Sequence, residues 1–169
     1  LGNSQVLPRD YVKQQEIELV LSEMAEQVAI RLRAIRKKTT TVSISIGYSR
    51  FEESTSFRGQ MKIEPTNQTE ELQKYVISLF RKKYNGGAVR SISVFYSSFV
   101  DENITILSLF DDPEEILKKE RLQTAIDAIR SQFGFTTLQK ANSLTSASRS
   151  IARSKLVGGH SAGGLDGLK

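Results

Sequence analysis

The sequence contains no cysteine and a single histidine, His160. The absence of cysteine excludes disulfides, thiolate metal sites and cysteine nucleophiles. Because the one histidine lies beside Gly159 in a glycine-rich segment, we expect neither a histidine-based metal site nor a Ser-His-Asp triad. No apolar run approaches the roughly 20 residues that a membrane span requires, and no signal peptide is visible. We therefore predict a cytoplasmic protein with no membrane partner and no metal-ligating residues in this chain.

The chain has 169 residues, which suits one domain of about 100–150 residues with appendages. Hydrophobic residues make up 38% of the sequence and charged residues 25%, which indicates a folded protein rather than a disordered one. The first residue is Leu1 rather than Met, so we expect a piece of a longer protein.

The net charge of +5 is unevenly distributed along the chain. Residues 1–100 contain 15 basic and 10 acidic residues, residues 101–134 contain 4 and 8, and residues 135–169 contain 5 and 1. Such changes of sign mark candidate boundaries. We predict a basic domain at 1–100, an acidic linker at 101–112, a helix at 113–134 and a basic, Ser/Gly-rich tail at 135–169, which we expect to be flexible from residue 143 onward.

Hydrophobic periodicity in the first hundred residues predicts strand, helix, strand, strand, helix and strand. Alternation of apolar and polar residues predicts the strands, and apolar residues three and four positions apart predict the helices. The predicted strands are 5–7, 41–50, 57–64 and 89–100, with Pro8 and Pro65 as strand ends; the predicted helices are 14–38 and 69–84, the second with Thr69 as N-cap. The apolar stripe of the first helix consists of Ile17, Val20, Leu21, Met24, Val28, Leu32 and Ile35.

This β-α-β-β-α-β order predicts an α+β fold, in which two helices cover one face of a four-stranded sheet and leave the other face open. The alternation places small hydroxyl side chains on the open face, together with the cations Arg58 and Lys62. Hydroxyls can donate to phosphate oxygens, and cations neutralise them, so this face favours a nucleic-acid backbone as ligand. The alternative is that these serines are simply the solvent side of the sheet.

Beyond the predicted domain, Pro113 and two glutamates at the start of an apolar periodicity predict a helix up to Phe133, stopped by Gly134. This helix either packs on the basic domain or projects as an arm. We expect residues 136–141 to form a short final strand.

Three segments of the sequence resemble one known family. Residues 1–11 (LGNSQVLPRDY), residues 104–112 (ITILSLFDD) and the helix at 120–133 are similar to the little finger and C-terminal extension of Y-family translesion DNA polymerases, in the UmuC-like (ImpB/MucB/SamB) branch of Gram-positive bacteria. The resemblance implies the DNA-gripping region of an error-prone polymerase that acts in DNA repair and the SOS response. The parent polymerase would use Mg²⁺ held by its palm, so this chain would contain no catalytic residue and would be inactive alone.

The resemblance also implies partners and binding residues. The partners are primer–template DNA, the bacterial sliding clamp and the rest of the parent polymerase. The little finger grips the sugar–phosphate backbone through its open sheet face. The expected DNA-binding residues are Ser43, Ser45, Arg58, Gln60, Lys62, Arg90, Ser91 and Ser93.

The clamp-docking motif of bacterial polymerases is a Gln-Leu-Ser/Asp-Leu-Phe pattern, which Leu107, Ser108, Leu109 and Phe110 match in its last four positions. Ile106 stands where the motif has glutamine. Apolar anchors of this kind fill a pocket on the partner. The alternative is that this segment forms a fifth strand packed on the domain.

Two other classes of function remain open at this stage. One is an RNA-recognition-type domain, which shares the order of strands and helices but places aromatic residues on the sheet to stack bases. Residues 57–60 (FRGQ) lack the aromatic residue that this family has after the glycine, and Phe95 is the one exposed aromatic candidate. The other is a protein-interaction module that uses the acidic segment and binds no nucleic acid.

Overall fold

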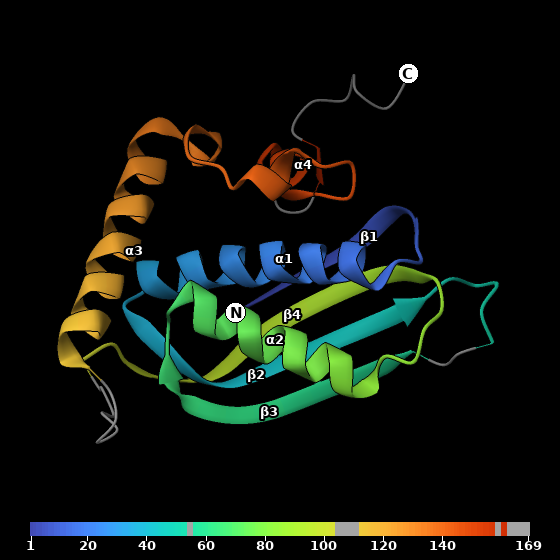
Figure 1. Ribbon diagram of the computed structural model, residues 1–169, viewed down its shortest axis with the longest axis horizontal. Helices are drawn as coiled ribbons and strands as arrows, with labels where there is room; N and C mark the ends of the chain where they lie inside the picture. The colour runs from blue at the N-terminus through green and yellow to red at the C-terminus, as the bar shows by residue number, and fades with distance from the viewer. Residues whose placement is uncertain (54–55, 104–111, 158–159, 162–169) are drawn as a thin grey trace.

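The computed structural model describes residues 1–53, 56–103, 112–157 and 160–161 of the chain. Four antiparallel strands form one sheet in the order β1-β4-β2-β3, and two helices cover one of its faces (Figure 1). In chain order these elements are β1 (Gly2–Tyr11), α1 (Gln14–Ala34), β2 (Lys37–Tyr48), β3 (Phe57–Thr66), α2 (Thr69–Lys83) and β4 (Val89–Asp101). The predicted α+β fold with β-α-β-β-α-β order is confirmed.

The hydrophobic core lies between the sheet and the two helices. Alternate residues of the central strands face the helices and are almost completely buried, as in the cross-strand pairs of Ile44 with Val94 and of Ile46 with Ile92. The apolar stripes of α1 and α2 cover them, and the buried helical residues include Ile17, Leu21, Met24, Val28, Leu72, Val76 and Phe80. No helix of the described residues lies on the other face of the sheet (Figure 1).

Both predicted helices have a boundary that requires correction. The first helix ends at Ala34 rather than at residue 38, because Arg36 adopts a left-handed backbone conformation (φ 52°) and β2 begins at Lys37. Ile35, assigned to the apolar stripe, is therefore 49% exposed. At the second helix the N-cap is Gln68 rather than Thr69, and the Thr69 hydroxyl instead accepts a hydrogen bond from Arg33 (3.1 Å).

Both edge strands contain a proline. The prediction of an edge strand around residues 5–7 is confirmed, although β1 extends on both sides of this segment. Its ladder with β4 is interrupted between Val6 and Tyr11, the stretch that contains Pro8. On the opposite edge, Pro65 is the penultimate residue of β3 rather than the residue after it.

The C-terminal extension begins with α3 (Pro113–Phe133), where the Asp112 side chain accepts a hydrogen bond from the backbone N–H of Glu114 (2.9 Å). Gly134 (φ 95°) ends the helix, as predicted. The predicted strand at 136–141 is wrong, since 3-10 turns occupy this region. The remaining elements are η1 (Phe135–Thr137), η2 (Ala141–Leu144), α4 (Ser150–Ser154), and the short paired strands β5 (Leu156–Val157) and β6 (His160–Ser161).

The prediction of a flexible tail from residue 143 requires correction up to residue 155, which continues the ordered segment that begins at residue 135. This segment crosses α1 on the side away from the sheet (Figure 1), and Ser143, Ala147 and Ser150 are buried. The Tyr11 hydroxyl donates a hydrogen bond to the backbone carbonyl of Ala147 (2.9 Å). The side chains buried here are small, so the composition that suggested flexibility instead permits close approach to α1.

Among the helices of the described part of the chain, none has the length and apolarity needed to cross a membrane.

Candidate nucleic-acid interface

The open face of the sheet carries rows of small hydroxyl side chains that run across the strands. One row joins Ser4 of β1, Ser93 of β4, Ser45 of β2 and Arg58 of β3, each paired with the next in the antiparallel register. The row therefore ends in an exposed guanidinium group. Hydroxyl groups in such a row can donate to successive phosphate oxygens while the cation neutralises their charge.

A second row lies beside the first. It joins Gly2, Phe95, Ser43 and Gln60, and the Ser43 hydroxyl lies 3.5 Å from the Gln60 side-chain oxygen. A depression of about 520 Å³ lies over the two rows. Its opening is on the face opposite the helices, so its lining is available to a ligand from solvent.

The cations of this face differ in whether they have a partner. Arg58 and Lys62 are exposed and make no ion pair with any described residue, which leaves their charge available to a ligand. The Lys83 ammonium, which donates to the backbone carbonyl of Arg58 (2.6 Å), adds positive charge beside β3. Glu64 follows Lys62 on β3 and confines the basic part of the face to the Arg58 end.

The structure brings together most, but not all, of the residues predicted to bind DNA. Those lining the depression are Ser43, Ser45, Arg58, Gln60 and Ser93. Lys62 pairs with Thr41, next to the Gln60 row, and Ser91 pairs with Gly47, next to the Ser45 row. Arg90 is the additional residue at the register break of β4, and its guanidinium lies 3.4 Å from the Asp10 carboxylate. Arg90 is thus less available to phosphate than Arg58.

Sequence reasoning missed Ser4 as a member of this face. The predicted strand at 5–7 excluded it, because residues 2–4 (GNS) have low strand propensity and show no apolar alternation. Its place in the row depends on β4 lying between β1 and β2, an order that periodicity alone does not give.

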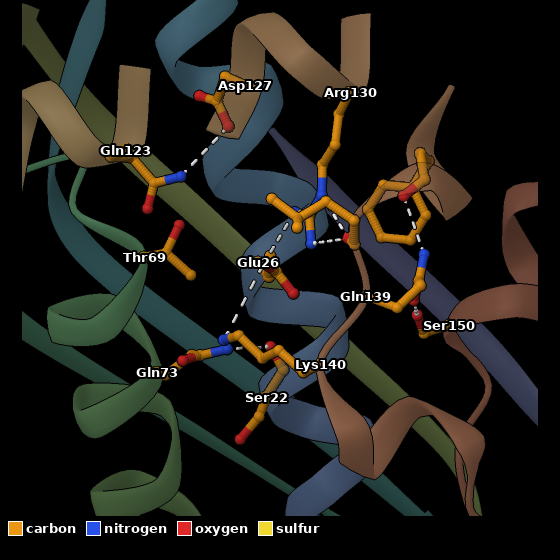
Figure 2. A network of polar contacts seen from close by, with 12 residues as sticks. Ser22, Glu26, Thr69, Gln73, Gln123, Asp127, Arg130, Gln139, Lys140 and Ser150 are labelled. Atoms are coloured by element: carbon orange, nitrogen blue, oxygen red, sulfur yellow. Dashed lines mark hydrogen bonds and ion pairs between the residues drawn. The ribbon is translucent and has the colours of Figure 1, made fainter. Parts of the chain in front are cut away.

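The predicted clamp-docking segment, residues 106–110, lies outside the described residues, as does most of the acidic linker. The helix that follows it is anchored by polar contacts (Figure 2). The Arg130 guanidinium lies 3.0 Å from the Glu26 carboxylate of α1, and their side chains are only 8% and 11% exposed. Near the C-terminal end of α1, Arg33 contacts Asp127 at 2.5 Å. These two ion pairs therefore hold the second half of α3 against α1.

The segment over α1 is fixed by a buried carboxylate and a partly buried cation. Glu23 accepts hydrogen bonds from the Ser148 hydroxyl and from the backbone N–H of Arg149 (2.8 Å). Burial raises the pKa of Glu23, and these hydrogen bonds oppose part of that rise. Arg153 donates to Gln5 at 2.7 Å and to Asn3, and its burial lowers its pKa. Both contacts connect the extension to the β1–α1 side of the domain.

In the described ranges, no three acidic or histidine side chains gather closely enough to hold a metal ion. The acidic pairs of the sequence, such as Glu52 with Glu53 and Glu70 with Glu71, lie in a loop and in the first turn of α2.

Comparison with known proteins assigns the chain to a family. The family model described as the impB/mucB/samB family C-terminal domain matches residues 1–109, and the chain belongs to this family. The resemblance to the C-terminal region of UmuC-like Y-family polymerases is thereby confirmed. The four-stranded sheet with two helices is consistent with the little-finger architecture that the resemblance implied.

The similar proteins include bacterial repair proteins and polymerases. The chain is 39% identical over 160 residues to UvrX of Bacillus subtilis, a protein named for UV-damage repair, covering 94% of this chain and 38% of that protein. It is 36% identical to DNA polymerase IV 2 of Bacillus subtilis, covering 95% of this chain and 39% of the polymerase. DNA polymerase IV 2 of Halalkalibacterium halodurans is 33% identical, covering 95% of this chain and 39% of that polymerase. The chain thus spans about two fifths of the length of these relatives.

Proposed function

We propose that this chain is the DNA-gripping and clamp-docking C-terminal region of a translesion DNA polymerase, which acts on damaged primer–template DNA in the bacterial cytoplasm. The observation that carries the DNA-binding part is the row from Ser4 to Arg58 on the open sheet face. The names of the relatives, which include DNA repair proteins and DNA polymerases, support the same reading.

The mode of binding follows from the chemistry of the face. Serine hydroxyls and unpaired cations fit the sugar–phosphate backbone, which is the same for every sequence. Binding should therefore show little sequence preference, and it should weaken steeply with salt because DNA releases counterions when phosphates are neutralised. A polymerase that moves along a template requires this kind of grip.

The DNA proposal is tested by reversing charge at Arg58→Glu and Lys62→Glu together. We expect weaker binding to primer–template DNA and a salt slope that falls by about 2, because each phosphate contact contributes about 1. Fluorescence anisotropy titrations at several salt concentrations measure both quantities. The matched control is Lys74→Glu with Lys82→Glu, which makes the same change in net charge at exposed positions of α2, on the helix side of the sheet. Equal losses in the two variants would show that net charge, and not the open face, binds DNA.

The clamp proposal concerns Leu107, Leu109 and Phe110, which we propose insert into the hydrophobic cleft of the sliding clamp. Truncating Leu109 and Phe110 to alanine should cost about 2 kcal/mol or more of binding free energy, whereas Ser108→Ala should have little effect. Ile106→Gln should tighten binding by restoring the polar contact of the motif. Surface plasmon resonance on immobilised clamp measures these affinities. If the unmodified 169-residue chain shows no affinity for the clamp and the double alanine variant melts at a lower temperature, the segment is a packed fifth strand instead.

The catalytic chemistry is assigned to the rest of the parent polymerase. We propose that its carboxylates hold the Mg²⁺ ions for phosphoryl transfer and that this chain supplies only grip and tethering. Primer-extension assays with the 169-residue chain, Mg²⁺ and nucleotides should therefore show no product; extension by the purified chain would refute this division of roles.

A further inference from the structure

Phe95 stands on the open face with no bulky side chain beside it. Its cross-strand neighbours are Gly2 and Ser43, and its neighbours two positions away on β4 are Ser93 and Ser97. The ring is 42% exposed and forms part of the wall of the depression. The ring packs over Gly2 on one side, and its small neighbours leave the rest of its apolar surface open to a ligand.

The Phe95 ring lies over Gly2, and the absence of a side chain at residue 2 makes room for it. A Cβ atom on residue 2 would lie 2.1 Å from Cδ1 and 2.5 Å from Cε1 of Phe95, so only glycine permits the ring to occupy this place. The Leu1 and Tyr96 backbones hold the two strands together here, through hydrogen bonds of 2.8 and 2.9 Å. The aromatic ring is therefore presented by a hydrogen-bonded part of the sheet.

We infer that Phe95 stacks on an unpaired nucleobase of the bound DNA, and that the depression around it is a base-binding subsite. This inference rests on the proposed function and adds a ligand class to the same face. Stacking on an aromatic ring is available to every base and preserves the lack of sequence preference. The base is unpaired because bases inside a duplex are stacked on one another and do not expose their faces.

The groups around the ring match the edges of a base and the phosphate attached to it. The Gln60 amide and the Ser43 hydroxyl, which lie in the same row as Phe95, offer both donors and acceptors without favouring one base. Arg58 belongs to the adjacent row and lines the same depression, where its cation can contact the neighbouring phosphate.

The experiment compares Phe95→Ala, Phe95→Tyr and the unmodified 169-residue chain. Anisotropy titrations use two DNAs of equal length, a blunt duplex and a primer–template with a single-stranded template overhang. We expect Phe95→Ala to weaken binding to the overhang DNA about tenfold, Phe95→Tyr to retain affinity, and blunt-duplex affinity to change little. Phe99→Ala is the matched control, since Phe99 is 40% exposed on the same strand but pairs with Thr39 outside the depression.

A second comparison removes the base instead of the ring and does not depend on the folding of a variant. Replacing the overhang nucleotides by abasic ones keeps the phosphates, and it should weaken binding of the unmodified chain by the same factor as Phe95→Ala, with no further loss when the two changes are combined. Salt-dependent binding that is indifferent to Phe95 and to abasic sites would overturn the base-binding subsite and leave the proposed function standing. Equal losses on both DNAs would also overturn it. If the unmodified chain binds neither DNA, the proposed function itself fails.

Discussion

At the scale of single residues, Glu23 links stability to pH. Burial raises its pKa above the ordinary value of 4.5, so the folded state holds this proton at a pH at which the unfolded state has released it. The stability due to Glu23 is therefore fully present below 4.5 and is lost as pH rises through the raised pKa of the folded state.

The variant Glu23→Gln should remove this dependence. Because glutamine does not ionise and its side-chain oxygen still accepts a hydrogen bond from Ser148 or Arg149, the variant should gain stability relative to the unmodified chain as pH rises from 4.5 toward neutrality. Urea denaturation at a series of pH values measures the difference in unfolding free energy. Glu18→Gln is the control with the opposite sign, since the Arg81 side chain holds the pKa of Glu18 below its ordinary value. A constant difference between the Glu23 variant and the parent would contradict the assignment.

Individual residues also show which contacts could not be predicted from the sequence. The alternation of β2 and β4 predicts which side chains share the open face, because side chains alternate strictly along a strand. It could not place Phe95 beside Gly2, because that contact depends on which strands are neighbours. Thr69 looked like an N-cap because hydroxyl residues favour that position, but its hydroxyl is used by Arg33.

At the scale of elements, α3 is held mainly by polar contacts and contains no buried residue. The contact of Arg130 with Glu26 is the most enclosed of its ion pairs, and Lys140 lies 4.0 Å from the same carboxylate (Figure 2). Polar contacts of this kind fix a geometry more than they add free energy, because each charge loses hydration on burial.

Removing both partners of this ion pair should therefore cost less than the sum of the costs of removing each one alone. Arg130→Ala leaves the Glu26 carboxylate enclosed with only a distant cation, and we expect a loss of about 3 kcal/mol of unfolding free energy. Glu26→Gln combined with Arg130→Ala should lose less than the sum of the single variants. A double-mutant cycle by denaturant unfolding measures this coupling, and it cancels the bonds from Arg130 to the Leu138 carbonyl, which both backgrounds lose. Additive losses would show that the ion pair contributes nothing of its own.

The helices show why periodicity predicts one face of an element better than the other. The stripe of α1 that faces the sheet is apolar at helical spacing and was predicted from the sequence. The opposite side contains Glu23 and Glu26, which are typical of a solvated surface, yet the extension buries both. Small residues and side-chain hydrogen bonds cover this side, and neither produces an apolar pattern.

At the scale of the whole molecule, the core is complete without the C-terminal extension. Its buried apolar residues come from the four-stranded sheet, α1 and α2, with Ala147 as the one contribution of the extension among the described residues. The family model matches nearly the same part of the chain, residues 1–109.

A chain ending at Asp112 should therefore remain folded. We expect native-like chemical-shift dispersion in its NMR spectrum and a lower melting temperature than that of the 169-residue chain, because the outer side of α1 loses its cover. The truncated chain should also retain the salt-dependent DNA binding proposed for the open sheet face, since this face lies on the other side of the sheet. Loss of chemical-shift dispersion on truncation would show that the extension is required for folding of the domain.

The two prolines at the sheet edges have a consequence for association between copies of the chain. An edge strand with free N–H and C=O groups can recruit a strand from another molecule, which leads to dimers or aggregates. Pro8 on β1 and Pro65 on β3 each remove one backbone N–H from an edge strand, and Pro8 coincides with a break in the ladder. We therefore expect the sheet edges of this chain to resist pairing with a second copy.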